Sequence, residues 1–253
     1  MSAEVICPVC GSNCSFLDAA DFNKSCEEQH GKFLTPSGIS ISYYLCNNCS
    51  FCFAPEFSSW KLQDFQEKIY NQDYIEVDPD YLDIRPRSNA HNLISMFGDR
   101  GSRIKHLDFG GGNGLLSRVL NAAKWRSTSY DPFVDKDVVL DSLGKFDLIT
   151  AFEVFEHVPD VNKLVKDISS LLKPDGIVLF STLVSDGNIE PSKGIDWWYA
   201  SPRNGHISLF SVKSLAILGA QLGFSFGSFS SGFHLYCKQV PLPSWASRLA
   251  GTS

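Results

Sequence analysis

Residues 110–114, Gly-Gly-Gly-Asn-Gly, form the segment with the clearest potential for chemistry. They follow a short apolar run that ends in Asp108-Phe109, and they precede an apolar stretch from Leu115 to Ala123. A glycine-rich turn between a strand and a helix lets a ligand approach the backbone, and the start of the helix presents unpaired N–H groups. Asp108 would repel a pyrophosphate at this turn, but it suits a cationic group such as the ammonium of an amino acid.

The glycine spacing argues against two common nucleotide-binding motifs. The dinucleotide fingerprint G-x-G-x-x-G would need a glycine where Leu115 stands, and the sequence contains no phosphate-binding G-x-x-x-x-G-K-[ST]. Asp131 ends the next expected strand and could accept hydrogen bonds from both hydroxyls of a ribose. The loop and its two carboxylates therefore predict a site for a nucleoside that carries a positive charge and no phosphate.

Seven of the eight cysteines lie within the first 52 residues, and four of them form two pairs with metal-binding spacing. Cys7 with Cys10 and Cys46 with Cys49 supply four soft thiolates, the set that tetrahedral zinc prefers. Such a closed site predicts a structural zinc rather than a catalytic one. Cys52 also follows Cys49 at the same spacing, so the second pair could be shifted, and no role is predicted for Cys14 or Cys26.

Alternating strands and helices position the glycine loop. Strands are expected at residues 104–109, 128–130, 138–141, 146–152 and 177–182, with helices at 115–123 and 161–172 between them. A mainly helical stretch, residues 57–100, precedes them with breaks at 78–79 and 85–86. Ser211 is expected to cap a helix that ends near residue 222, and a hairpin follows at 224–229 and 233–237.

This pattern predicts an α/β protein with a doubly wound, mostly parallel seven-stranded sheet and a C-terminal antiparallel hairpin. We expect a zinc ribbon-like module at residues 1–60, with a strand at 39–45 leading into the second cysteine pair. The cofactor-binding domain would span residues 61–240, and residues 241–253 would form a loosely held tail. The module could act as a substrate lid or docking element, or it could only brace the larger domain.

Composition limits the partners. The chain has 253 residues, 43% of them hydrophobic, and a net charge of −6, which disfavours a nucleic-acid partner. No run approaches the roughly 18 apolar residues of a membrane span, and the first ten residues do not resemble a signal peptide. We therefore expect a cytoplasmic protein.

Three segments carry a resemblance to a known family. Residues 106–114 resemble motif I of class I S-adenosylmethionine-dependent methyltransferases, and residues 146–149 with 153–158 resemble the fourth-strand motif of their ubiquinone O-methyltransferase-like branch. Residues 172–176 are similar to the family's turn before the fifth strand. The resemblance covers about residues 70–237, and the paired cysteines also resemble the zinc-binding head of some sugar C-methyltransferases.

The resemblance implies S-adenosylmethionine as the cofactor, and it implies positions for its parts. The methionine part would lie against Asp108, Gly110 and Gly112, while Gly114 keeps the loop tight. The ribose would bind Asp131, and the adenine would lie near Asp141. The remaining contacts would come from Phe152 and Glu153 at the sulfonium and from Arg87 at the methionine carboxylate.

Two histidines are candidate bases for an oxygen or carbon acceptor, which must lose a proton. His157 follows the strand at 146–152, and His206 lies in a long loop rich in aromatic residues. In that loop, Trp197, Trp198 and Tyr199 could stack on a ring of the acceptor, and Arg203 could pair with an anionic group.

The leading hypothesis is a methyltransferase that acts on a small-molecule or sugar-linked metabolite. A zinc-headed RNA methyltransferase is the second hypothesis, and the net charge weighs against it. The third is a non-catalytic protein that binds a partner through the ribbon, and the intact glycine loop with Asp131 weighs against that.

Overall fold

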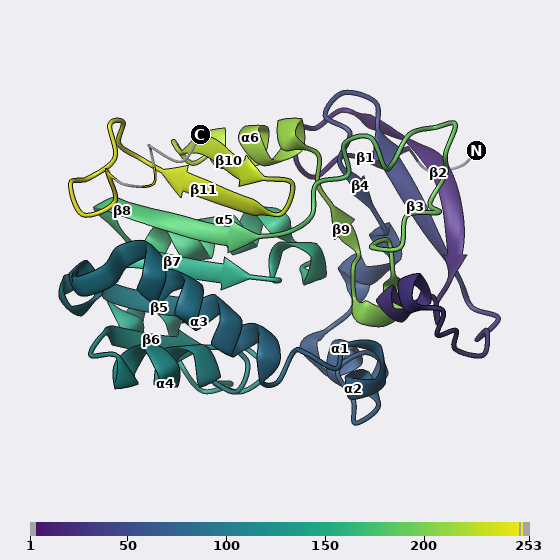
Figure 1. Ribbon diagram of the computed structural model, residues 1–253. Helices are drawn as coiled ribbons and strands as arrows, with labels where there is room; N and C mark the ends of the chain where they lie inside the picture. The colour runs from purple at the N-terminus through teal and green to yellow at the C-terminus, as the bar shows by residue number, and fades with distance from the viewer. Residues whose placement is uncertain (1–3, 248, 250–253) are drawn as a thin grey trace. The chain divides into compact units, whose positions relative to one another are not determined.

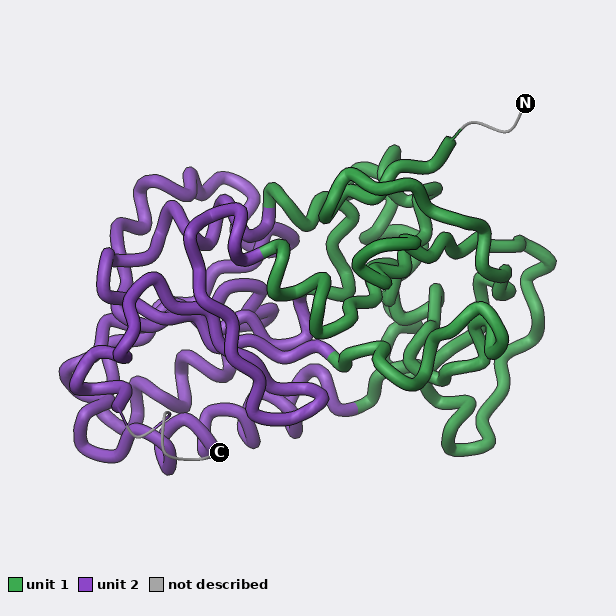
Figure 2. Tube along the Cα trace, turned by 90° about the horizontal axis from the view of Figure 1, so that it is seen from above, with its two compact units in different colours: residues 1–79, 155–163, 183–218 green, residues 80–154, 164–182, 219–253 purple. Residues whose placement is uncertain are grey.

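The structure is a computed structural model, and it describes residues 4–247 and 249. The chain forms two compact units, coloured separately in Figure 2, and passes between them several times. Unit 1 comprises residues 1–79, 155–163 and 183–218, and unit 2 comprises residues 80–154, 164–182 and 219–253. This division differs from the expected ranges 1–60 and 61–240, because segments far along the chain join the cysteine-rich region in unit 1.

Unit 2 is built on a six-stranded sheet with the strand order β10-β11-β8-β7-β5-β6 (Figure 1). The four strands β8, β7, β5 and β6 are parallel, and β11 and β10 extend the sheet as the expected antiparallel hairpin. The strands are β5 (Lys105–Phe109), β6 (Arg126–Tyr130), β7 (Phe146–Phe152), β8 (Leu172–Ser181), β10 (Ser225–Ser230) and β11 (Phe233–Cys237).

Helices lie on both sides of this sheet. α3 (Ile84–Phe97) and α4 (Leu115–Ala122) pack on one face through a buried cluster that includes Leu93, Leu116, Leu120 and Leu148. α5 (Val161–Leu171) lies on the opposite side of the strands in Figure 1. Burial of both faces explains why β7 and the second half of β8, in the middle of the sheet, are mainly apolar, whereas the edge strand β6 is polar and alternates in burial.

The structure corrects the expected count of seven strands, because residues 138–141 form none. Val138 and Val139 are 37% and 68% exposed, and the 3-10 helix η4 (Leu140–Leu143) begins where the strand was expected. Valines that face solvent have no sheet or helix to cover them, so their β propensity alone does not produce a strand here.

Two further boundaries differ from expectation. Pro86 does not break a helix but occupies the first turn of α3, where its missing N–H would have had no intrahelical partner. Residues 173–176, expected as a turn, belong to β8, which pairs with β7 through a register shift between Phe146 and Leu148. The breaker residues there produce an irregularity within a strand instead of ending it.

The expected loose tail is wrong for its described part. Ala246 and Leu249 are 1% and 6% exposed, and they belong to the cluster that α3 and α4 form with the sheet. The Trp245 ring packs against that of Phe97, with 5.9 Å between centroids. Residues 248 and 250–253 lie outside the described residues.

Unit 1 is built on a five-stranded antiparallel sheet with the order β1-β2-β3-β4-β9. The expected strand at 39–45 is confirmed, with a shift of one residue. Pairing of Cys52 with Leu209 brings a segment from late in the chain into this sheet. The strands are β1 (Val5–Ile6), β2 (Asn13–Asp21), β3 (Ser40–Cys46), β4 (Cys52–Phe53) and β9 (Ser208–Leu209).

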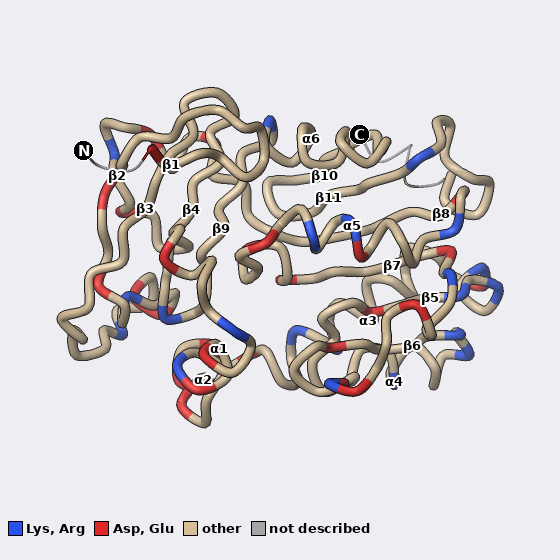
Figure 3. Tube along the Cα trace, turned by 180° about the vertical axis from the view of Figure 1, so that it is seen from behind, with Lys and Arg blue, Asp and Glu red and all other residues tan. Residues whose placement is uncertain are grey.

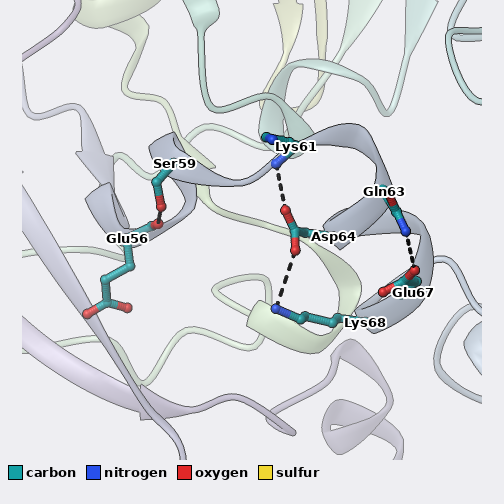
Figure 4. Close-up of polar contacts among 7 residues, drawn as sticks. All are labelled: Glu56, Ser59, Lys61, Gln63, Asp64, Glu67 and Lys68. Atoms are coloured by element: carbon teal, nitrogen blue, oxygen red, sulfur yellow. Dashed lines mark hydrogen bonds and ion pairs between the residues drawn. The ribbon is translucent and has the colours of Figure 1, made fainter.

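Short helices complete unit 1, and side chains fix where they start. At the start of α1 (Leu62–Lys68), the Asp64 carboxylate accepts the backbone N–H of Lys61 at 2.8 Å and pairs with Lys68 (Figure 4). The expected cap of α6 (Val212–Ala220) is confirmed, since Ser211 Oγ accepts the N–H of Ser214 at 3.0 Å. The remaining short elements are α2 (Tyr74–Val77), η1 (Cys26–His30), η2 (Pro55–Ser59), η5 (Phe155–His157) and η6 (Pro202–Asn204); unit 2 also contains η3 (Gly98–Arg103).

Acidic and basic residues are interspersed along the chain (Figure 3). Within the described residues, no helix combines the length and the apolar character that a membrane crossing requires.

Candidate functional site

The glycine loop lies between β5 and α4, at the carboxyl end of the parallel strands. Its first two N–H groups, of Gly110 and Gly111, donate to the carbonyl of Tyr130 at 2.8 and 3.2 Å. A Cβ atom on Gly110 would lie 2.5 Å from Val154 Cγ2, and Gly110 has a φ of +76°. Only glycine combines this positive φ with the lack of a Cβ atom, so no other residue would fit this bend.

Asp108 supplies a buried carboxylate directly before this loop. Its side chain is only 4% exposed, and Thr150 Oγ1 on β7 donates to Oδ1 at 2.9 Å. Its other oxygen, Oδ2, faces the loop, because a Cβ on Gly111 would lie 2.5 Å from it. Burial raises the pKa of Asp108 to about 7, because the ionised form is poorly solvated there. A cationic partner would stabilise the ionised carboxylate.

A second polar atom faces the same point of the loop. Ser129 Oγ on β6 would lie 2.3 Å from a Cβ on Gly111, and it is buried without a hydrogen-bond partner among the described residues. Buried hydroxyls normally have partners, and a ligand that carries N–H donors would provide one. The contact of Asp108 with the ammonium of an amino acid stays a prediction, and the structure adds Ser129 Oγ as a second buried oxygen beside the same glycine.

Asp131 lies just beyond β6 on the other side of the loop. Its carboxylate accepts the N–H groups of Gly112 at 3.0 Å and Phe133 at 2.8 Å. Burial raises its pKa, although these two hydrogen bonds act in the opposite direction. Each carboxylate oxygen can accept more than one hydrogen bond, so the hydroxyls of a ribose could be added to these partners.

Phe152 and Glu153 follow at the end of β7, next to the end of β8. Glu153 has a φ of +54°, which is uncommon outside glycine and costs about 1–3 kcal/mol. Ser181 holds this conformation, since its Oγ accepts the Glu153 N–H at 2.8 Å and donates to Oε1 at 2.7 Å. Phe152 is half-buried and packs on Phe233. Strained residues at strand ends often mark ligand sites.

Two other predicted cofactor residues lie in less suitable surroundings. Asp141 is exposed in η4, so the strand end that suggested its contact with adenine does not exist. Arg87 is half-exposed on α3 and pairs with Asp83 at 2.9 Å. An exposed pair of this kind is weak, so Arg87 could exchange Asp83 for a ligand carboxylate.

His157 and His206, the candidate bases, lie together in unit 1. Their ring centroids are 4.9 Å apart, and ligand atoms of Glu156, His157 and His206 all lie within 4.8 Å of one another. Glu156 is fully buried and accepts the Tyr199 hydroxyl at 2.5 Å. Such a carboxylate–imidazole group can exchange protons or coordinate a divalent cation.

The aromatic loop has a mixed role. Tyr199 is buried, its ring lies tilted against that of His206 with 4.1 Å between centroids, and its hydroxyl donates to Glu156. Trp197 and Trp198 are half-buried against Tyr199. Arg203 is 7% exposed and donates to the Ile69 carbonyl at 2.9 Å and to Asn71 Oδ1. These contacts hold the Arg203 guanidinium against the chain, and its expected pairing with an anionic group of the acceptor stays a prediction.

The cysteine pairs converge as the spacing predicts. All four sulfurs of Cys7, Cys10, Cys46 and Cys49 lie within 4.8 Å of one another, with 3.6 Å between Cys7 and Cys49 and 3.4 Å between Cys10 and Cys46. Thiolates at about 2.3 Å from a tetrahedral zinc would be about 3.8 Å apart, close to these separations. The backbone N–H groups of residues 48 and 49 both donate to Cys46 Sγ at 3.4 Å.

The other N-terminal cysteines lie outside this cluster. Cys52 is buried in β4, so the second pair is not shifted onto it. Cys14 lies opposite Cys46 in the pairing of β2 with β3, and Cys26 Sγ lies 3.6 Å from His206 Nδ1.

The sequence alone predicts no role for His106, Ser129 or Thr150. All three lie on the same face of neighbouring strands as Asp108, because the register pairs Asp108 with Ser129 and with Thr150. One signal was present in the sequence: His106 stands two residues before Asp108 in the same strand, so both side chains lie on one face.

Comparison with known proteins supports the assignment made from these motifs. A family model described as "Methyltransferase domain" matches residues 81–226. The ubiquinone biosynthesis O-methyltransferase of Colwellia psychrerythraea is 33% identical over 89 residues, which cover 33% of this chain and 34% of that protein. The enzyme of the same name from Pelagibacter ubique is 32% identical over 126 residues, covering 40% and 52%. The matches thus span about a third to a half of these relatives.

Solved structures show more distant likenesses. Human N-acetylserotonin methyltransferase in complex with SAM is 16% identical, with a TM-score of 0.47 and coverage of 69% of this chain and 60% of that one. An O-methyltransferase family protein from Burkholderia thailandensis is 14% identical, with a TM-score of 0.44 and coverage of 62% and 57%. Likenesses at this level carry no argument about function.

The family match, in contrast, covers more than half of the chain and includes the glycine loop with both carboxylates. The chain therefore belongs to the methyltransferase domain family, as its resemblance to class I S-adenosylmethionine-dependent methyltransferases predicted.

Proposed function

We propose that this protein transfers a methyl group from S-adenosylmethionine to an oxygen or carbon atom of a small-molecule or sugar-linked metabolite. The observation that carries the proposal is the loop at 110–114, which lies between two buried carboxylates. Asp108 Oδ2 and the unpartnered Ser129 hydroxyl both face Gly111. These oxygens can accept the N–H groups of an amino acid ammonium, and neither of the two residues offers a cation to a pyrophosphate.

Within unit 2, Asp108 would hold the amino group of the cofactor and Asp131 its ribose, while Gly110, Gly112 and Gly114 leave the backbone accessible. Glu153 and Phe152 would border the sulfonium, and Arg87 would reach the carboxylate after leaving Asp83. Asp141 has no support for a contact with adenine. When bound, the cofactor supplies a methyl group already activated on sulfur, so the protein's task is mainly to orient the acceptor and remove its proton.

His206 or His157 would take that proton. His206 Nδ1 lies 2.7 Å from the Tyr199 carbonyl, so a proton on Nδ1 is donated there and Nε2 becomes the basic nitrogen. Glu156 would stabilise an imidazolium in this cluster, and Tyr199 holds Glu156 in place. Trp197 and Trp198 would contact the acceptor ring.

A cavity of about 350 Å³ in unit 1 supports an apolar acceptor. Ile207 and Pro159 line it, and each is close in sequence to one of the two histidines. The names of the curated relatives, ubiquinone biosynthesis O-methyltransferases, favour a hydroxyl oxygen as the acceptor. The other lining residues are Val5, Ile6, Pro8, Phe53, Ala54, Pro55, Ser58 and Ser208.

We also propose that the four clustered cysteines hold a structural zinc. Four thiolates fill the coordination sphere, so no position remains for a substrate. The metal would stabilise a unit whose strands β1, β4 and β9 have two residues each.

Isothermal titration with S-adenosylhomocysteine tests the proposal. We expect Asp131→Asn to weaken binding about tenfold or more, because buried hydrogen bonds to a charged group contribute about 1.5–3 kcal/mol. The matched control is Asp141→Asn, which changes an exposed carboxylate of the same unit and should bind like the wild type. If the wild-type protein does not bind the nucleoside, or if both variants bind equally well, the proposed site is wrong.

A further inference from the structure

A chain of hydrogen bonds runs beneath the glycine loop. Ser117 Oγ on α4 lies 2.8 Å from Ser127 Oγ on β6, which lies 2.7 Å from His106 Nδ1 on β5. On the other side of the ring, His106 Nε2 lies 3.0 Å from Thr150 Oγ1 on β7, and Thr150 Oγ1 lies 2.9 Å from Asp108 Oδ1. The chain crosses the three strands β6, β5 and β7 of unit 2 and ends at the carboxylate.

The register of the strands creates this chain. His106 pairs with Ser127, and Asp108 pairs with Thr150, so all four side chains share one face of the sheet. That face is otherwise covered by apolar side chains of α3 and α4. Buried polar groups are costly unless each has a partner, so the protons of this chain must be arranged consistently.

The available protons fix two arrangements. Burial lowers the pKa of His106 to about 3, so the ring is neutral and carries one N–H. When Asp108 is ionised, Thr150 donates to Oδ1, and the single hydroxyl proton of Thr150 is used. His106 must then donate from Nε2 to Thr150, accept at Nδ1 from Ser127, and leave Ser127 to accept from Ser117, since either serine hydroxyl can donate.

When Asp108 is protonated, every bond in the chain reverses. Asp108 donates to Thr150, and Thr150 donates to His106 Nε2. The ring then carries its proton on Nδ1 and donates to Ser127, which donates to Ser117. In both arrangements every group from Asp108 to Ser127 has a partner for its proton or its acceptor, and the two differ in the tautomer of one buried histidine.

We propose that Thr150, His106 and the two serines are positioning residues that hold the Asp108 carboxylate for the cationic amino group of the cofactor, and that His106 changes tautomer as Asp108 changes charge. This inference rests on the proposed cofactor. Among the described residues, Asp131 is the neighbouring titratable group that disfavours ionisation of Asp108, and Asp135 lies beyond it. Glu153 is held by Ser181, and α4 carries one charged residue, Arg118, which donates to the Asn113 carbonyl.

Binding of two nucleosides can distinguish a positioning role of Thr150 from a general loss of structure in a variant. S-Adenosylhomocysteine carries the amino acid group, whereas 5′-methylthioadenosine keeps the ribose and adenine but lacks it. At pH 7, Thr150→Val should weaken the first ligand about tenfold and leave the second unchanged, since the lost hydroxyl donates to a charged group. Thr150→Ser should restore binding. The matched control is Thr182→Val, at the end of β8, whose hydroxyl has no hydrogen-bond partner among the described residues.

Nitrogen NMR of the His106 ring tests the chain directly, with His106→Gln identifying its signals. The proton should move from Nδ1 to Nε2 as the pH rises through the titration of Asp108, and S-adenosylhomocysteine should fix it on Nε2. A single tautomer throughout, or equal weakening of both nucleosides by Thr150→Val, would overturn the inference. If neither nucleoside binds the wild-type protein, the proposed function fails, and the pH titration of the ring still decides the chain.

Discussion

The two units hold their candidate sites in place by different means. In unit 2, Asp108 and Asp131 sit at the ends of adjacent parallel strands, and pairing of β5 with β6 over five residues fixes their separation. In unit 1, the four clustered cysteines lie beside strands as short as the two residues of β1 and β4. Backbone pairing therefore preforms the first site, whereas the zinc that we propose would hold the second one together.

This difference shows that one chain can form binding sites in two ways, by strand pairing and by metal–ligand bonds. A parallel sheet places side chains before any ligand arrives, because its hydrogen bonds and its buried faces define the strand ends. A metal-bound turn gains its structure from the ligand bonds themselves. The two sites should accordingly respond differently to chelation, substitution and pH.

Removal of the proposed zinc should have the largest effect, because it should unfold unit 1 and leave unit 2 folded. Structural zinc sites contribute about 10 kcal/mol or more, so Cys46→Ser or a strong chelator should unfold the sheet of unit 1. Hydrogen exchange measured by mass spectrometry should rise across residues 5–53 and stay low in β5 and β7. Cys26→Ser is the matched control, since the Cys26 sulfur contacts His206 and is not one of the four clustered thiols. Purified wild-type protein that contains no zinc would contradict the proposed metal site.

Loss of the base should reduce turnover without affecting either fold. General bases contribute about 10²–10⁴-fold, so His206→Ala or His157→Ala should lower kcat by that amount while affinity for S-adenosylhomocysteine stays constant. His91→Ala, an exposed histidine on α3, is the control. Full activity in both variants would show that neither histidine removes the proton.

A single methyl group should damage the preformed site. In Gly111→Ala, the new Cβ would lie 2.5 Å from Asp108 Oδ2 and 2.3 Å from Ser129 Oγ. Such overpacking costs about 1–3 kcal/mol, so binding of S-adenosylhomocysteine should weaken about tenfold to a hundredfold. Gly227→Ala in β10 is the control, because its nearest neighbour would be 3.8 Å away. Equal affinity in both variants would contradict the geometry of the loop.

The smallest change, a shift in pH, should distinguish the carboxylate site from the thiolate site. Burial raises the pKa of Asp108 to about 7, and a cationic ligand favours the ionised form and lowers that pKa. Binding below pH 7 must therefore release a proton, so affinity for S-adenosylhomocysteine should fall about tenfold per pH unit as the pH drops below 7. It should be level just above pH 7, and Asp108→Asn should abolish the slope. A wild-type affinity that is constant from pH 5.5 to 7 would exclude Asp108 as the partner of the ammonium.

The sequence predicts correctly those elements whose apolar residues are in fact buried in the structure. The glycine loop, the strands at 104–109 and 146–152, and the cysteine cluster all appear where residue type and spacing place them. The strand at 138–141 does not form, because Val138 and Val139 have no neighbour to cover them. Spacing cannot reveal the environment of a side chain, so Arg203, charged and in an aromatic loop, suggested a ligand contact although its guanidinium bonds to Ile69 and Asn71.

The hydrogen-bond chain below the loop could not be predicted for a similar reason. His106 and Thr150 are 44 residues apart, and only the register between β5 and β7 brings them together. A pattern of polar residues within one strand indicates which face they share, but the partner strand has to be known before the bonds can be assigned.

A crystal structure with S-adenosylhomocysteine tests the central claim most directly. The account predicts the two ribose hydroxyls within hydrogen-bond distance of the Asp131 carboxylate, and the amino group between Asp108 Oδ2 and Ser129 Oγ. A nucleoside bound elsewhere, or a loop at 110–114 that neighbouring side chains keep covered at saturating ligand, would contradict it.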